Sequence, residues 1–141
     1  MTDYRAYLSE IEIAGDLIIK IDRVIEFYQK ILSDFKAEDI FVTDIISEDG
    51  AREYQNLWLL GPNIIAEAKR FNTSDDFDFV KYDREKILYW NLKKKNFDLE
   101  SFNDESRLDI SVSYRSNISL SFKAARNNCI YLMEIMKKYF L

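Results

Sequence analysis

The chain has few side chains that could carry out catalysis: of its 141 residues, none is histidine and one, Cys129, is cysteine. The lack of histidine excludes a histidine base, nucleophiles activated by one, and every histidine-ligated metal site. No glycine-rich phosphate loop occurs either. Cys129 falls on the apolar side of a predicted C-terminal helix, which is typical of a core residue rather than a nucleophile. We therefore predict a protein that is not an enzyme and holds no cofactor.

Acidic residues gather in two segments where they could bind a metal or act as a catalytic pair. The two clusters are Asp75, Asp76 and Asp78, and Asp98, Glu100, Asp104 and Glu105. A calcium loop needs oxygen ligands at fixed spacing and a glycine for its sharp turn, and neither cluster has them. Nothing in the spacing selects a carboxylate pair of the glycosidase kind. We interpret both clusters as polar loops and predict no metal site.

The one basic cluster is Lys93-Lys94-Lys95, with Arg84 and Lys86 nearby in the sequence. These five side chains are a candidate contact for an anionic ligand, such as a phosphate, a lipid headgroup or an acidic peptide. The alternative is a solvated hairpin turn, in which lysine protects a sheet edge from aggregation. Charge runs on a surface usually serve solvation, which favours the second interpretation.

Two adjacent aromatic residues, Tyr89 and Trp90, are a candidate contact for a protein partner. The chain has 2 Trp, 9 Tyr and 10 Phe, and most of them must fill the core. Because neighbouring side chains of a strand point to opposite faces, at least one of this pair can be exposed. Exposed aromatic side chains are frequent hot spots of protein interfaces.

Apolar residues in the first third of the chain predict one long helix over residues 3–35, within an N-terminal helical arm at 1–36. Tyr4, Ile11, Ile18, Ile25 and Leu32 occupy one heptad position, and Tyr7, Ala14, Ile21, Tyr28 and Phe35 occupy the other. Gly15 is the weak point of this helix, because glycine costs about 1 kcal/mol relative to alanine in a helix interior. It marks either a kink or a break into two helices.

So long a helix is difficult for one small domain to cover, and two interpretations stay open. In the first, a docking or self-association face of the helix packs against another chain. In the second, the helix lies wholly across its own sheet. The residues of the predicted face are Tyr4, Ile11, Ile18, Ile21, Ile25, Tyr28 and Leu32.

Residues 37–141 form a second predicted region, in which the apolar period changes from helical to two. After a short extended segment at 40–45, strands are predicted at 53–60, 64–71, 77–82, 87–92, 97–102, 108–114 and 118–122. The last two alternate apolar and small polar residues, which indicates a half-buried antiparallel pair. An amphipathic helix over about residues 124–140 follows. The predicted fold class is therefore α+β.

Seven strands in meander order followed by a C-terminal helix resemble the pleckstrin-homology-like (PH-like) fold over residues 53–140. Leu57-Trp58-Leu59-Leu60-Gly61-Pro62-Asn63-Ile64-Ile65 looks like the first hairpin of bacterial members, and the run from Ile118 to Ala125, leading into Leu132-Met133-Glu134-Ile135-Met136, looks like the last strand and capping helix. The resemblance implies a strongly bent seven-stranded antiparallel barrel capped by the helix. It also implies a platform that binds proteins, peptides or lipids. The first turn lacks the flanking basic residues of members that bind phosphoinositides.

Charge is unevenly distributed along the chain and bears on the kind of partner. The net charge is −5, while residues 1–80 hold 8 basic and 17 acidic side chains, a net charge of −9. An acidic chain repels nucleic acid and anionic membranes, so neither is expected as a partner. We predict a non-catalytic binding or adaptor protein with a protein partner, whose N-terminal helix serves as a docking or self-association arm. The alternative is a small acidic immunity-type or antitoxin-type inhibitor that neutralises a basic protein.

Location in the cell is predicted from what the sequence lacks. No apolar run approaches the roughly 20 residues of a membrane span, and no signal peptide is visible at the start. A single cysteine fits a reducing compartment. The cytoplasm is therefore the expected location.

Overall fold

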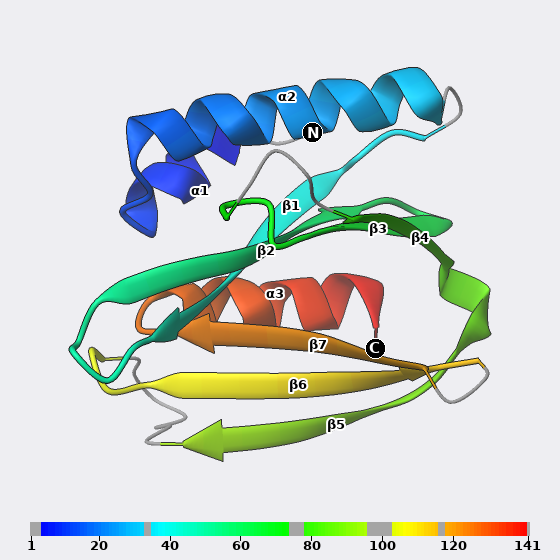
Figure 1. Cartoon of the computed structure of the whole chain (residues 1–141). Coiled ribbons are helices and arrows are strands. Elements are labelled where there is room, and N and C mark those ends of the chain that lie inside the picture. The colour runs from blue at the N-terminus through cyan, green and yellow to red at the C-terminus, as the bar shows by residue number, and fades with distance from the viewer. Residues whose placement is uncertain (1–3, 33–34, 74–77, 96–102, 116–117, 141) are drawn as a thin grey trace. The chain divides into compact units, whose positions relative to one another are not determined.

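The computed structural model describes residues 4–32, 35–73, 78–95, 103–115 and 118–140, with only the backbone described at 88–90 and 92–95. Within these ranges the chain is α+β, as predicted, with three α-helices and seven strands (Figure 1). The elements in chain order are α1 (Tyr4–Glu10), α2 (Gly15–Ile31), β1 (Asp39–Ile46), β2 (Arg52–Leu60), β3 (Ile64–Lys69), β4 (Asp78–Asp83), the 3-10 turn η1 (Arg84–Lys86), β5 (Ile87–Lys95), β6 (Arg107–Tyr114), β7 (Ile118–Ala125) and α3 (Asn128–Tyr139). No helix in the described ranges has both the length and the apolar character needed to cross a membrane.

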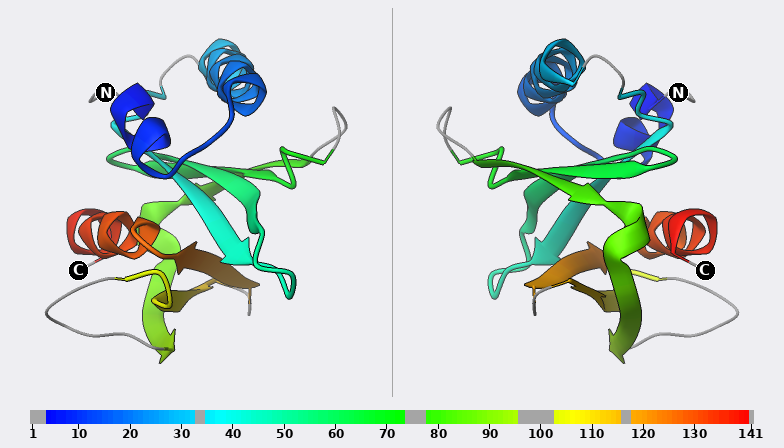
Figure 2. Two further views of the ribbon diagram at one scale, coloured as in Figure 1. Left: turned by 90° about the vertical axis from the view of Figure 1, so that its left-hand side faces the viewer. Right: turned by 90° about the vertical axis from the view of Figure 1, so that its right-hand side faces the viewer.

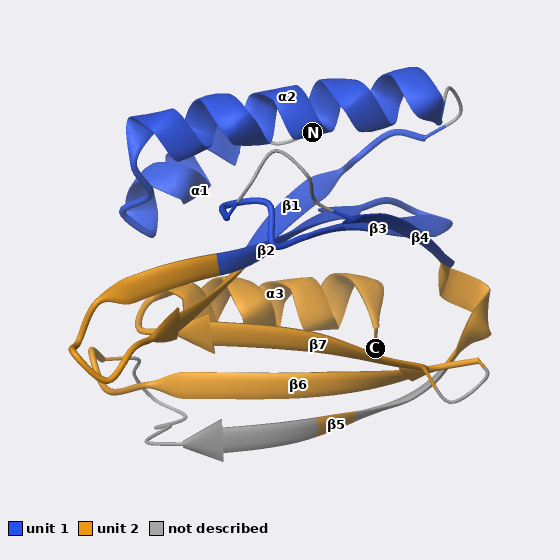
Figure 3. Cartoon of the chain, viewed as in Figure 1, with its two compact units in different colours: residues 1–42, 55–82 blue, residues 43–54, 83–141 orange. Residues whose placement is uncertain are grey.

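The chain divides into two compact units (Figure 3). Unit 1 comprises Met1–Val42 and Gln55–Tyr82, and unit 2 comprises Thr43–Tyr54 and Asp83–Leu141. The boundary falls inside β1 and β2, so the far end of this hairpin belongs to unit 2. The division therefore differs from the predicted one at residue 36, because α1 and α2 share a unit with strands.

The strands form two antiparallel sheets, and the predicted strongly bent seven-stranded barrel is therefore wrong. One sheet has the order β1-β2-β3-β4 and the other has the order β5-β6-β7. The turn η1 separates β4 from β5, and no strand pairing among the described residues joins these two. Neither sheet closes on itself. The fold implied by the resemblance to PH-like domains is corrected accordingly.

The strand count of seven agrees with the sequence prediction, but its members differ. The segment at 39–46 is a full strand rather than a short extension, and its centre from Ile40 to Asp44 is buried. Because Thr43 and Asp44 are buried as well, the strand lacks the alternation that identifies a half-exposed strand. The predicted strand at 97–102 lies outside the described residues.

The predicted long N-terminal helix is instead two helices, α1 and α2, that are separated by residues 11–14. Glu12 has a φ of 63°, a left-handed conformation that no helix continues through. The amide of Ile13 donates to the carbonyl of Leu8, and Ile11 and Ile13 are both buried at this turn. The heptad pattern continues across the break because Ile11 keeps its spacing, although the next heptad residue, Ala14, is exposed.

In unit 1, α1 and α2 lie on the same side of the strands, as the views in Figures 1 and 2 show. The hydroxyl of Tyr7 in α1 accepts a hydrogen bond from the amide of Val42 in β1 at 3.0 Å. The hydroxyl of Tyr28 in α2 donates to the carbonyl of Glu67 in β3 at 2.7 Å. Both helices are thus fastened to strands of their own unit by tyrosine hydroxyls that reach main-chain groups.

In unit 2, β6 and β7 form the hairpin that the sequence predicts, with Ile110 opposite Phe122 and Val112 opposite Leu120. These four residues are buried. Helix α3 packs against β7 and β6, and the ring of Phe140 lies 5.4 Å from that of Phe122. The predicted C-terminal helix is confirmed, although it begins at Asn128 rather than at residue 124.

Candidate functional site

The side of α2 that faces solvent carries large apolar residues in one row, and this row is the candidate site. Ile19, Phe27 and Ile31 are 56%, 43% and 57% exposed. With Arg23, which is also exposed, they follow one another at intervals of four residues, so they form a ridge along the helix. We call Ile19, Arg23, Phe27 and Ile31 the outer row of α2.

The opposite side of α2 explains why the outer row must point away from the strands. Ile21, Val24, Ile25 and Tyr28 are buried on that side. An amphipathic helix on a sheet normally places polar residues opposite such a stripe. Large apolar side chains at Ile19 and Ile31 therefore exceed what packing on the sheet requires, whereas Phe27 also contacts a ring of the sheet.

Phe27 is partly fixed in place by a neighbour from the sheet. Its ring centroid lies 4.5 Å from that of Phe79 in β4, and the ring of the adjacent Tyr28 meets Phe79 edge-on at 4.8 Å. A half-exposed ring held by other rings loses little side-chain freedom when it is covered. Phe27 thus has the features of a pre-organised anchor for a protein contact.

Charged residues border the outer row. Glu26 and Lys30 are exposed beside it. Asp22, by contrast, is engaged inside unit 1, where it accepts hydrogen bonds from the hydroxyl of Tyr4 and, at 2.7 Å, from Arg5. An apolar centre with a charged border is the usual anatomy of a protein interface.

The docking face predicted from the heptads is largely unavailable to a partner. Ile11, Ile21, Ile25 and Tyr28 are buried, and Tyr4, Ile18 and Leu32 are half-buried. This stripe packs on strands of the same unit, which is the second of the two interpretations. The periodicity identified the apolar stripe, but a stripe that fits a neighbouring helix also fits the chain's own sheet.

The candidate anion site is not brought together by the structure. Arg84 donates to the carbonyl of Tyr139 at 2.7 Å and covers its ring, and Lys86 pairs with Asp83 at 3.2 Å. Lys93-Lys94-Lys95 belong to the other end of β5, roughly 20 Å from Lys86 at about 3.3 Å per residue. Only the backbone of these three lysines is described.

The aromatic pair Tyr89 and Trp90 also belongs to the part of β5 whose side chains are outside the description. Its backbone register places Tyr89 opposite Ser113 and Trp90 opposite Val112. Val112 is buried, so position 90 shares the face of the sheet that carries the core residues of β6. Position 89 shares the opposite face.

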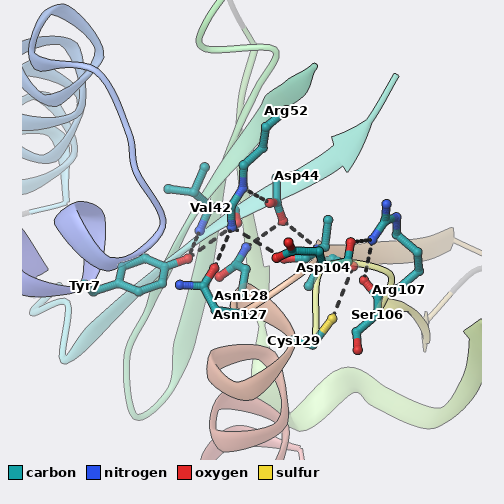
Figure 4. A network of polar contacts seen from close by, with 12 residues as sticks. Tyr7, Val42, Asp44, Arg52, Asp104, Ser106, Arg107, Asn127, Asn128 and Cys129 are labelled. Atoms are coloured by element: carbon teal, nitrogen blue, oxygen red, sulfur yellow. Dashed lines mark hydrogen bonds and ion pairs between the residues drawn. The ribbon is translucent and has the colours of Figure 1, made fainter. Parts of the chain in front are cut away.

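A buried polar cluster in unit 2 has no counterpart in the sequence predictions (Figure 4). Asp44 accepts hydrogen bonds from Arg52 at 2.7 Å, from the side-chain amide of Asn128 at 2.7 Å and from the backbone amide of Ala125 at 2.9 Å. Arg52 also donates to the side-chain oxygen of Asn127 at 3.0 Å. The cluster connects the far end of the β1–β2 hairpin to the junction between β7 and α3.

The pKa shifts in and beside this cluster favour a structural role over a reactive one. Burial raises the pKa of Asp44, although the hydrogen bonds from Asn128 and Arg52 oppose that shift. Burial likewise raises the pKa of the Cys129 thiol to about 12, with the nearby carboxylate of Asp44 as a further cause. A thiol that stays protonated is a poor nucleophile, which agrees with a core role.

Unit 1 contains a second buried carboxyl group, that of Glu67 in β3. Burial raises its pKa from the ordinary value of 4.5 to about 7. The hydroxyl of Tyr82 donates to it at 3.3 Å, and Trp58 lies opposite it in β2. Because Glu67 is only 5% exposed and its hydrogen-bond donor is a tyrosine of the same sheet, we assign it to the interior of the unit.

Metal-binding groups are not gathered anywhere in the described ranges, where no three acidic or cysteine side chains come together. Asp75 and Asp76 of the first acidic cluster, and Asp98 and Glu100 of the second, lie outside these ranges. Comparison with protein-family models, curated proteins and solved structures returns no match to this chain. The proposals below therefore rest on the geometry of the chain itself.

Proposed function

We propose that this chain is a non-catalytic protein-binding module that docks its partner on the outer row of α2. The observation that supports the proposal is the exposure of Ile19, Phe27 and Ile31 in one row of α2, of which, among the described residues, only Phe27 is seen in contact with a ring of the sheet. Large apolar side chains grouped on an exposed surface are typical of protein contacts. A cytoplasmic location is part of the proposal and is supported by the single, buried cysteine.

The entropy cost of binding at this surface should be low. Phe27 is pre-oriented by Phe79, so covering it gains apolar burial with little loss of side-chain entropy. Arg23 within the row, and Glu26 and Lys30 beside it, favour partners of complementary charge. The proposal keeps the non-catalytic adaptor predicted from sequence, but it moves the docking surface from the heptad face to the outer row and no longer includes a PH-like barrel.

Site-specific photo-crosslinking tests the proposal in cells that produce the full chain. A photoreactive residue is placed at Ile19 or Ile31, and in the matched control at Ile130, which is 42% exposed on α3. We expect discrete adducts from positions 19 and 31 and none from position 130. An outer row that yields no adduct, or only the pattern seen at position 130, would overturn the proposal.

A second candidate function, an acidic inhibitor of a basic protein, is favoured by a different observation. Glu10, Glu12 and Asp16 are all exposed around the connection between α1 and α2. Such an inhibitor would bind through charge, with an affinity that falls steeply with salt. Reversing the three charges to lysine should then abolish capture of a basic protein, whereas Ile31→Ser should leave it unchanged. The opposite result would favour the outer row.

A further inference from the structure

We infer that the partner docked on the outer row is a second copy of this chain, with the two α2 helices antiparallel. This inference rests on the proposed function and specifies its partner. It follows from the order of residues in the row, which is Ile19, Arg23, Phe27, Ile31. Read from the other end, the same row is isoleucine, phenylalanine, arginine, isoleucine. In an antiparallel pair of identical rows, each isoleucine therefore faces an isoleucine, and the arginine faces the phenylalanine.

A two-fold axis across the middle of the row gives each side chain a suitable neighbour. Ile19 of one copy meets Ile31 of the second copy, and Arg23 meets Phe27 of the second copy. Each contact occurs twice, because a two-fold interface repeats every pair. The first pair joins apolar surfaces, and the second places a guanidinium over an aromatic ring. Ridges of side chains four residues apart commonly pack side by side, each in a groove of the other helix, with the helix axes crossed at about 50°.

The charge of Glu26 supports the antiparallel direction. Glu26 is exposed and borders the outer row three residues after Arg23, so a long arginine side chain that arrives over Phe27 of the second copy can also reach this carboxylate. A parallel pair in register would place Arg23 against Arg23 and Glu26 against Glu26. Like charges in such positions cost binding energy and select against that arrangement. The antiparallel pair is therefore favoured by both its apolar and its charged contacts.

The size of the row sets the strength that we expect. It spans 13 residues of one helix, or about 20 Å at 1.5 Å per residue. One helix against one helix buries less area than a stable dimer does. Self-association should accordingly be weak and should depend on protein concentration.

Sedimentation equilibrium of the full chain at low salt measures this association directly. We expect dimers to appear as the concentration rises to about 500 µM, and the dissociation constant to rise about tenfold or more in Arg23→Glu and in Phe27→Glu, because each contact occurs twice. Ile130→Glu on α3 is the matched control and should behave as the parent chain does. A chain that stays monomeric throughout, or a dimer unchanged by both variants, would overturn the inference.

Mixing two charge variants gives the most specific result. Arg23→Glu and Glu26→Arg should each be weak dimers alone, because each places like charges together. Their mixture should form a heterodimer, and the double variant R23E/E26R should bind itself more tightly than either single variant does, although less tightly than the parent chain, because it restores the charge pair without the guanidinium over Phe27. A mixture that shows no preference for the heterodimer contradicts the antiparallel arrangement.

The photo-crosslinks separate failure of this inference from failure of the proposed function. Adducts of twice the chain mass from position 31 support the second copy. Adducts of another mass, together with a monomeric chain in the centrifuge, leave the outer row as a docking surface and overturn only the inference. An absence of adducts contradicts the proposed function itself.

Discussion

Helices α2 and α3 both lie on antiparallel strands and bury one apolar side, yet their solvent-facing sides differ. Three large apolar residues are exposed on α2, whereas Ile130 is the exposed large apolar residue of α3. The exposed surface of α3 is otherwise formed by Glu134, Lys137 and Lys138. Helix α3 shows that a helix can pack on strands with one such residue, and the additional exposed apolar residues of α2 are the basis of the proposed docking surface.

The N-termini of the two helices also differ, and here α3 has the additional contacts. The first residue of α3, Asn128, donates its side-chain amide to the buried carboxylate of Asp44. Helix α2 begins at Gly15, and the residue before it, Ala14, has no side chain that could accept a hydrogen bond from the helix. The start of α3 is thus fixed by buried polar contacts, while the start of α2 has no side-chain cap.

Removal of Asp44 should have the largest effect, because it breaks the anchor that distinguishes α3. Asp44→Ala leaves Arg52 buried without its carboxylate, and removing one member of a buried pair typically costs about 3 to 5 kcal/mol. Urea unfolding should show a loss of this size, and the double variant D44A/R52A should recover part of it. Glu48→Ala, an exposed control in the same hairpin, should change little. A loss below about 1 kcal/mol would show that the cluster does not anchor the helix.

The buried carboxyl of unit 1 should make stability depend on pH. The pKa of Glu67 rises from 4.5 when unfolded to about 7 when folded, so the folded chain binds the proton more tightly. The free energy of unfolding should therefore fall as pH rises from about 4.5 to about 7, by up to about 3 kcal/mol.

Glu67→Gln tests this dependence, since the amide keeps the shape of the protonated carboxyl. The variant should be more stable than the parent chain at pH 8 and should lose most of the slope between pH 5 and pH 7. Urea unfolding at a series of pH values measures both effects. Glu26→Gln, which alters an exposed carboxylate, is the control. An unchanged slope in Glu67→Gln would assign the pH dependence to other groups.

The sequence predicts local elements of this fold better than their assembly. Alternation from Leu108 to Phe122 identifies the last hairpin, because one face of that hairpin is buried and the other is polar. β1 lacks this signal, since Thr43 and Asp44 are as buried as their apolar neighbours. The division into two sheets depends on the single turn η1, for which no strong glycine or proline signal exists.

The candidate site is harder to predict from the sequence than the fold is. Heptad spacing identifies which side of α2 is apolar, but it cannot state whether the chain or a partner covers that side. Ile19 and Phe27 fall outside the heptad positions, and this departure was the available signal for a second contact surface. The cluster around Asp44 could not be predicted, because its members are far apart in sequence and follow no motif.

A side-chain N-cap introduced at Ala14 should stabilise the start of α2, which has no such contact. Ala14 has φ −73° and ψ 152°, the extended conformation of an N-cap residue. Ala14→Asp or Ala14→Ser supplies an oxygen for the free amides of the first turn and should add about 0.5 to 1 kcal/mol to the stability. Aspartate should exceed serine slightly, because its charge also complements the helix dipole. Thermal unfolding of both variants measures the gain, and a loss in both would show that this start is already satisfied.

The smallest effect on stability should come from the outer row itself, and it separates folding from binding. Ile31→Ser on α2 and Ile130→Ser on α3 remove side chains that are 57% and 42% exposed, so each should change the free energy of unfolding by no more than about 0.5 kcal/mol. Only Ile31→Ser should also weaken self-association in the centrifuge, because it removes an apolar contact that occurs twice in the dimer. A large loss of stability in Ile31→Ser would assign this residue to the fold. Equal association in both variants would remove the distinction between the two helices, because the exposed residues of α2 would then contact nothing that those of α3 do not.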